Sequence, residues 1–107
     1  MNNNNCASYL ELLISRSKAQ LDQAVAEERP VEPRIKKLWL ESKTRLKQLE
    51  NACGGGTLSP EDYTDMIKTQ KAKDVQMVQY FKKTGQAEKA KICLERAQVI
   101  QKELSEM

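Results

Sequence analysis

Apolar residues recur along the chain at intervals of three and four positions, which is the spacing of one face of an α-helix. Proline or glycine interrupts this pattern at 29–33, 52–57 and 83–86. The interruptions divide the chain into segments that are each long enough for one helix. Helices are expected over about 7–28, 33–51, 59–84 and 86–103.

Each predicted helix has one apolar face, which we expect to be buried. The first two faces consist of Leu10, Leu13, Ile14, Ser17, Leu21, Ala24 and Val25, and of Ile35, Leu38, Trp39, Ser42, Leu46 and Leu49. The third consists of Tyr63, Met66, Ile67, Met77, Val78 and Phe81, interrupted by Gln70 and Asp74. The fourth consists of Ala87, Ala90, Cys93, Leu94, Ala97, Ile100 and Leu104.

The third helix has the strongest start signal. Ser59 can cap it, Pro60 has the φ angle of a first helical position, and Glu61 and Asp62 follow at the positive end of the helix dipole. Gly85 tolerates a positive φ and is expected to end this helix. Pro33 suits the first turn of the second helix in the same way.

A shift of 53 positions superimposes the apolar face of the first helix on that of the third, and a shift of 55 relates the second to the fourth. We therefore predict an all-α fold, an antiparallel four-helix bundle built from two helical hairpins in one domain over 1–107. The hairpins are expected at 7–52 and 59–105, with a glycine-rich linker at 53–58. The linker could instead let the hairpins exchange between chains, which would give a homodimer.

Composition favours a folded helical chain and excludes most enzyme classes. Apolar residues make up 39% and charged residues 31%, and there is no histidine to act as a base or metal ligand. The cysteines, Cys6, Cys53 and Cys93, are far apart and have no CxxC spacing. We therefore expect no catalytic residue, no metal site and no cofactor.

Three features could suggest chemistry, and each has a simpler explanation. Asp74 interrupts an apolar face, where a partner such as Lys18 or an open edge of the bundle would relieve its burial. Cys93 is expected to be a small buried residue rather than a nucleophile. The run Gly54 to Gly56 lacks the Lys and Ser/Thr of a phosphate-binding loop, so we interpret it as a linker.

The outer face of the second helix carries the most suggestive pattern. Lys36, Lys43 and Lys47 fall on one stripe with Leu40 beside them, and this stripe is well away from the core face. Cations there could steer an acidic protein partner while the leucine contributes desolvation. The third helix has similar lysines around Val75, namely Lys68, Lys71 and Lys82. The alternative is an ordinary solvated surface with extended lysine stems.

Charge balance and aromatic content argue against a nucleic-acid partner. The net charge is only +3, residues 1–52 carry 9 basic and 7 acidic side chains, and residues 53–107 carry 9 and 8. Few aromatic rings are available for base stacking. No apolar run approaches the length of a membrane span, and 1–6 lacks the features of a signal peptide, so we expect a cytoplasmic protein. Because the last predicted helix runs almost to Met107, we expect a piece of a longer protein.

Residues 80–97, with the sequence YFKKTGQAEKAKICLERA, resemble hairpins of the form GxxEKAKxxLxxA in the coiled-coil and C2 domain family that includes Lethal giant discs. Hairpins of microtubule-interacting-and-trafficking domains and tetratricopeptide repeats also look like this. The first hairpin is similar only in layout, because its loop has two prolines where the family has glycine and an acidic residue.

The resemblance implies a non-catalytic module of endosomal trafficking whose basic hairpin surface binds the acidic face of an ESCRT-III subunit. The basic positions that match are Lys82, Lys83, Lys89 and Lys91. No catalytic residue is implied.

Our first hypothesis is therefore an interaction module that presents lysine-rich stripes to an acidic helix of a protein partner. The rival hypothesis is a structural assembly module, in which the hairpins pair between chains in a coiled-coil-like dimer. An enzyme is the remaining alternative, and a pocket with paired polar groups would indicate one.

Overall fold

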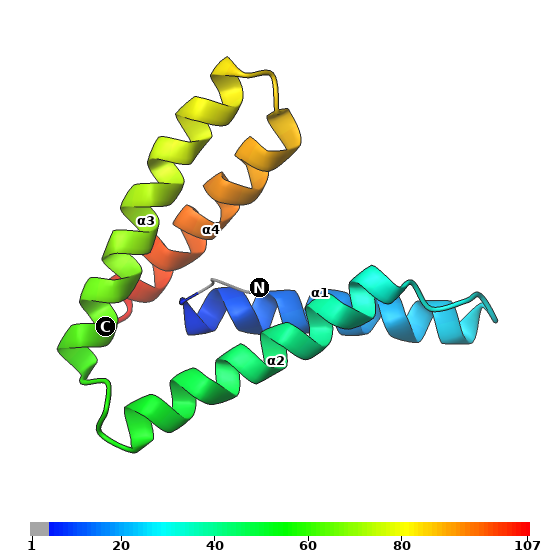
Figure 1. Ribbon diagram of the computed structural model, residues 1–107, viewed down its shortest axis with the longest axis horizontal. Coiled ribbons are helices and arrows are strands. Elements are labelled where there is room, and N and C mark those ends of the chain that lie inside the picture. Colours follow the sequence, from blue (N-terminus) through cyan, green and yellow to red (C-terminus); the bar gives the residue numbers. More distant parts are fainter. Residues whose placement is uncertain (1–4) are drawn as a thin grey trace. The chain divides into compact units, whose positions relative to one another are not determined.

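The chain folds into helices only, over the part that the structure describes. The computed structural model describes residues 5–107, which form α1 (Ala7–Ala26), α2 (Pro33–Gly54), α3 (Pro60–Lys83) and α4 (Ala87–Ser105), with no strand in this range (Figure 1). The prediction of an all-α fold with four helices is confirmed.

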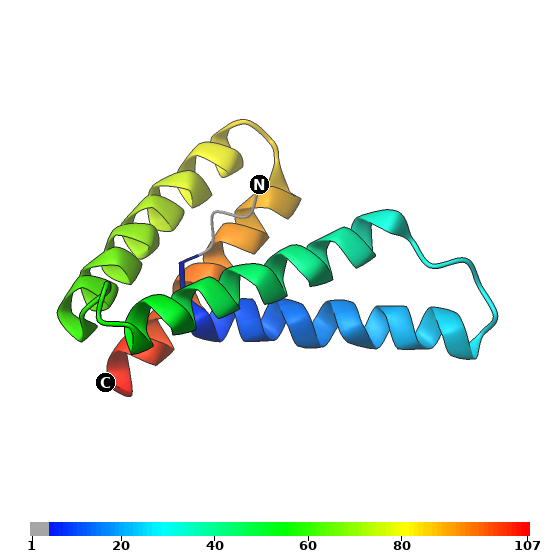
Figure 2. The same ribbon diagram turned by 60° about the horizontal axis from the view of Figure 1, so that its bottom comes forward.

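The helices associate in sequential pairs. α1 lies antiparallel to α2, and α3 lies antiparallel to α4, as two views show (Figures 1 and 2). The chain accordingly divides into two compact units, Met1–Gly55 and Gly56–Met107. The two predicted helical hairpins are therefore present, each within its own unit. Their packing into one bundle stays a prediction.

Helix α3 begins where its sequence signal places it. The hydroxyl oxygen of Ser59 accepts a hydrogen bond from the backbone N–H of Asp62 at 3.0 Å, and Pro60 occupies the first turn. Gly85 follows the end of the helix with a φ of 74°, a conformation that a residue without a Cβ adopts at little cost. Both predicted boundaries of this helix are confirmed.

Helix α2 extends further than its sequence predicts. It continues past Asn51 to Gly54, so two positions of the expected linker are helical. The backbone N–H of Gly55 still bonds to the carbonyl of Asn51 at 2.8 Å, and the chain leaves the helical path at Gly56, where φ is 79°. The helix therefore does not end at the first glycine of the run. It ends where a glycine first adopts a positive φ, a conformation that other residues rarely adopt.

Small side chains line much of the buried seam of both hairpins. Buried residues of α1 and α2 include Leu10, Ser17, Ala24, Ser42 and Leu49. Those of α3 and α4 are Ile67, Asp74, Val78, Ala90, Cys93, Ala97 and Ile100. Alanine and serine at such positions allow helix axes to approach closely.

Some residues assigned to the core by periodicity are exposed. Val25 is 67% exposed and Leu94 is 45% exposed, while Leu38, Met77 and Ala87 are also open to solvent. Val25 lies in the last turn of α1, next to the loop. Leu94 lies about 100° around the α4 axis from Cys93, so it sits at the edge of the seam that α4 makes with α3. The face that each of these helices buries is therefore narrower than the apolar face that its sequence indicates.

Candidate functional site

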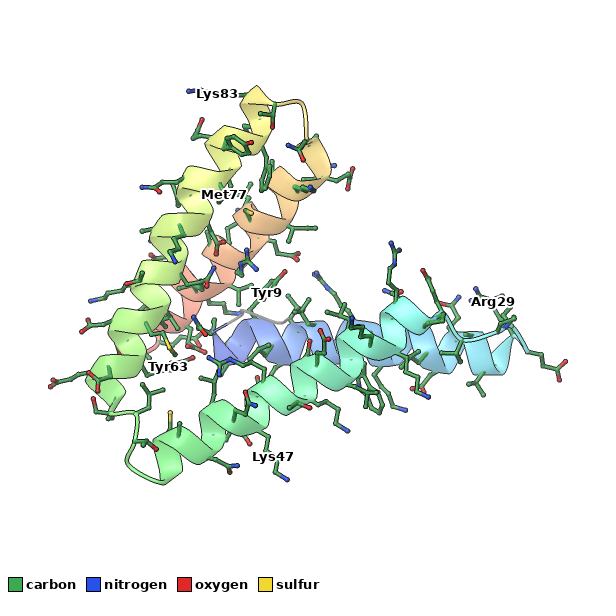
Figure 3. All side chains as sticks on the ribbon, viewed as in Figure 1. Tyr9, Arg29, Lys47, Tyr63, Met77 and Lys83 are labelled. Carbon is green, nitrogen blue, oxygen red and sulfur yellow. The ribbon has the colours of Figure 1, made fainter. Side chains whose placement is uncertain are left out.

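The predicted stripe on α2 is exposed along its whole length. We call Lys36, Leu40, Lys43 and Lys47 the α2 surface; all are solvent-exposed, and Leu40 keeps 47% of its area accessible. Their spacing of three or four residues places them on one side of the helix. Lys47 points away from α1 (Figure 3). The structure thus brings these predicted binding residues together on a single face.

Trp39 borders the α2 surface and links it to α1. The ammonium nitrogen of Lys43 lies 4.3 Å from the Trp39 ring centroid, and that of Lys18 lies 5.7 Å from it. Trp39 is half-buried, so its ring adds apolar area beside Leu40. Lys43 follows Trp39 by four residues, a spacing already visible in the sequence. The contribution of Lys18 depends on how α1 and α2 align, and periodicity alone missed it.

Three cations of the α2 surface are available to a partner. Among residues 5–107, Lys36, Lys43 and Lys47 form no ion pair with a carboxylate, whereas the neighbouring Lys37 lies 3.9 Å from Glu41. Lys36 and Lys47 can therefore meet an acidic partner without first breaking an ion pair, whereas Lys43 would leave its contact with the Trp39 ring. The α2 surface therefore combines accessible positive charge with accessible apolar area.

The second predicted set of lysines surrounds the turn between α3 and α4, and we call Lys82, Lys83, Lys89 and Lys91 the turn surface. All are exposed, and Lys83 lies at the tip of this hairpin (Figure 3). The Lys89 ammonium lies 5.7 Å from the Phe81 ring centroid, and that of Lys91 lies 4.0 Å from a Glu88 carboxylate oxygen. Lys89 and Lys91 point to opposite sides of α4, about 200° apart around its axis. The turn surface is therefore a ring around the hairpin tip rather than one face.

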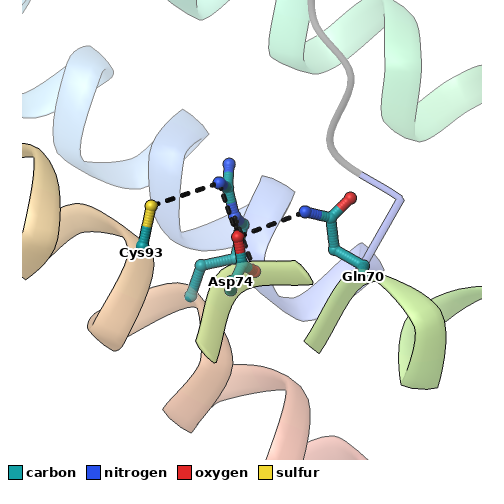
Figure 4. Close-up of polar contacts among 4 residues, drawn as sticks. Gln70, Asp74 and Cys93 are labelled. Carbon is teal, nitrogen blue, oxygen red and sulfur yellow. Dashed lines mark hydrogen bonds and ion pairs between the residues drawn. The ribbon is translucent and has the colours of Figure 1, made fainter. Parts of the chain in front are cut away.

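Asp74 pairs with Arg96, not with Lys18 as the sequence suggested (Figure 4). Arg96 donates to Asp74 from Nε and Nη2, with distances of 2.8 to 3.0 Å, and the amide of Gln70 donates to Oδ1 at 3.3 Å. The correction has a geometric cause, since Arg96 reaches Asp74 across the α3–α4 seam and Lys18 instead pairs with Asp22.

The Asp74–Arg96 pair is built for structure rather than proton transfer. Asp74 is 1% exposed, and both of its carboxylate oxygens accept hydrogen bonds from a guanidinium group that stays charged. Cys93 lies beside the pair and is buried, as expected for a small core residue. The arrangement satisfies a buried charge and leaves no oxygen open to a substrate.

The described residues contain neither a cluster of metal ligands nor a helix that could cross a membrane. No three His, Cys, Asp or Glu side chains of 5–107 gather closely enough to hold a metal ion. None of the four helices is both long enough and apolar enough to span a bilayer.

No protein-family model, curated protein or solved structure matches the chain. The structure describes two lysine-rich surfaces, the α2 surface and the turn surface. Of these, the α2 surface is a single face with both charge and apolar area, so it is the better-formed candidate site.

Proposed function

We propose that this chain is a non-enzymatic protein-interaction module that binds an acidic helical surface of a partner protein. One observation carries the proposal. Leu40 is 47% exposed on a rigid helix, among lysines that pair with no carboxylate of the described residues. An exposed leucine alone is ordinary, but one framed by cations offers a partner both attraction and burial.

The two parts of the α2 surface would act at different stages of binding. Lysine charges raise the rate of encounter with an acidic partner, and salt screens this effect over a Debye length of about 10 Å at 0.1 M. Leu40 and the open edge of Trp39 would lose contact with water in the complex, which stabilises it by about 25 cal/mol per Å² of apolar area. Both parts are needed for a bound state that is selective and persistent.

The sequence resemblance of 80–97 suggests the class of partner. It supports an endosomal-trafficking adaptor that binds the acidic face of an ESCRT-III subunit in the cytoplasm, with the turn surface as a second contact. The free thiols of Cys53 and Cys93 are compatible with a reducing compartment. The α2 surface does not depend on this resemblance, so the general and the specific proposals can be tested separately.

The proposal is tested by charge reversal and calorimetric titration of a purified ESCRT-III subunit. One variant carries Lys36→Glu, Lys43→Glu and Lys47→Glu, and another carries glutamate at the four lysines of the turn surface. A control variant reverses exposed cations away from both surfaces: Arg29, Arg34, Lys73 and Lys102. We expect each surface variant to weaken binding by more than about tenfold and the control by much less.

Helicity by circular dichroism shows that each variant is folded, so a loss of binding refers to the surface. Leu40→Asp in the α2 surface should weaken binding without changing the cations. Equal affinity of the surface variants and the wild type would reject these surfaces. A molecular mass in solution that rises with concentration and depends on Leu40 would instead favour the assembly of hairpins between chains.

A further inference from the structure

A shallow groove runs between α3 and α4, along the stripe of Lys68, Lys71 and Val75 that the sequence indicated. Its volume is about 670 Å³, and Ala72, Val75 and Leu104 provide its apolar floor. Val75 is 49% exposed although it is branched, apolar and in the middle of a 24-residue helix. The groove therefore leaves apolar area uncovered where two helices already form a rigid wall.

The border of the groove is basic. Lys68 and Lys71 lie on its α3 side, and none of its lining residues is acidic. The ammonium of Lys71 donates a hydrogen bond to the side-chain oxygen of Gln101, which ties the two walls together. Lys82 follows Val75 by seven residues and lies on the same side of α3, so the positive edge continues towards the turn. On this side of α3 the nearest acidic residue is Asp65, which precedes Lys68 by three positions and does not line the groove.

We propose that this groove binds an amphipathic helix of a partner protein, with apolar residues in the groove and carboxylates facing Lys68 and Lys71. This inference rests on the proposed function and adds to it a separate site. The lining of α3 runs from Lys68 to Gln76, eight helical steps of about 1.5 Å or roughly 12 Å. That length suits about two turns of a bound helix, with anchors at i, i+4 and i+7.

The chemistry of the groove favours a protein helix over two other ligands that bind basic surfaces, namely nucleic acid and a lipid membrane. Single-stranded nucleic acid is held largely by stacking of bases on aromatic side chains, and no aromatic residue lines this groove. A membrane surface is held by bulky apolar side chains that protrude into the lipid. The apolar residues here are Ala72, Val75 and Leu104, and the largest of them, Leu104, is half-buried, so no bulky side chain stands out to enter lipid.

The test uses the full chain labelled with ¹⁵N and two synthetic helical peptides. Both peptides carry leucines at i, i+4 and i+7, one flanked by glutamates and the other by lysines. We expect the acidic peptide to shift amide resonances of 68–76 and 101–104, and the basic peptide to leave them unchanged. Val75→Asp, and separately Lys68→Glu with Lys71→Glu, should each weaken binding of the acidic peptide by more than about tenfold.

Matched controls lie on the same hairpin. Ile92→Asp changes an apolar residue of α4 that is 52% exposed and outside the groove, and Lys73→Glu reverses an exposed cation elsewhere on α3. Each should change the affinity by less than about twofold, and helicity by circular dichroism should match the wild type in all variants.

The outcomes separate the groove from the proposed function. Shifts confined to α2, with Val75→Asp unchanged in affinity, would overturn the groove while recognition of acidic helices stands. No saturable shift anywhere in the chain would count against both. Phosphatidylserine vesicles or a uridine oligonucleotide that shift 68–76 more strongly than the acidic peptide would replace the protein helix as the ligand.

Discussion

In the hairpin of α3 and α4, polar side chains reach across the seam, with Arg96 bonding to Asp74 and Tyr63 donating to Glu103 at 2.5 Å. In the hairpin of α1 and α2, Arg45 donates to Asn5 at 2.6 Å, but small buried side chains occupy the centre of the seam. Ser17 lies nine residues before the end of α1 and Ser42 nine residues after the start of α2, so the two are level with each other. The Ser17 hydroxyl donates to carbonyls of its own helix, at Leu13 and Ile14.

The difference shows two ways to specify the alignment of a hairpin. A directional ion pair penalises misalignment, because sliding one helix past the other leaves a buried charge without its partner. Small side chains act by shape instead, since they fit where the helices approach closely and larger neighbours do not. The two hairpins should therefore respond to different kinds of substitution, although their topology is the same.

The largest expected effect is loss of the ion pair in the α3–α4 hairpin. Arg96→Met leaves the Asp74 carboxylate buried and uncompensated, which should lower the free energy of unfolding by about 3–5 kcal/mol. Amide hydrogen exchange in the full chain measures this loss of stability, because protection of the amides can be compared between the α3–α4 and α1–α2 hairpins. Adding Asp74→Leu to this variant should recover most of the loss. Unchanged protection of α3 in the single variant would show that the pair does not hold the hairpin.

An intermediate effect is expected from enlarging the centre of the α1–α2 seam. Ser17→Leu adds volume where the residue is 1% exposed, which should cost about 1–3 kcal/mol through overpacking. Ser17→Ala serves as the control and should cost less, since the lost hydrogen bonds lie within one helix. Urea unfolding monitored by circular dichroism measures both. Equal stability of Ser17→Leu and the wild type would mean that close approach is not what aligns this hairpin.

The smallest expected effect concerns the helix starts. Ser59→Ala removes the side-chain cap of α3 and should lower stability by about 1 kcal/mol. Glu32→Ala is the matched change at the start of α2, where the residue makes no capping hydrogen bond and only an exposed pair with Arg34. It should cost a few tenths of a kcal/mol at most. Equal losses in thermal unfolding would argue that the cap contributes nothing specific.

Much of the fold was predictable because it depends on local signals. Periodicity located the four helices, and the sequence at Ser59, Pro60 and Gly85 located both ends of α3. The exposure of Val25 and Leu94 was not predictable. A helical wheel shows the direction of each side chain around the axis, but not how much of the helix surface a neighbouring helix covers. The end of α2 at Gly54 was missed because three consecutive glycines do not show which of them adopts a positive φ.

The candidate site was predictable where it lies on one helix. The exposure of Leu40 and its three lysines follows from spacing within α2. The partners Arg96 and Lys18 lie on the other helix of each hairpin, so these contacts depend on how the two helices align. Arg96 reaches Asp74 and Lys18 reaches Trp39 for this reason. A groove such as that beside Val75 likewise exists only once both helices are in place.

Trp39 is the chain's single tryptophan, and it lies beneath the ammonium groups of Lys18 and Lys43 at the border of the α2 surface. Its fluorescence therefore originates from one known place. A ligand that covers this border would dehydrate the indole and displace the lysines, which would change its emission wavelength and quenching by iodide. The single tryptophan thus makes the intrinsic fluorescence of the protein a direct optical reporter for occupancy of the α2 surface.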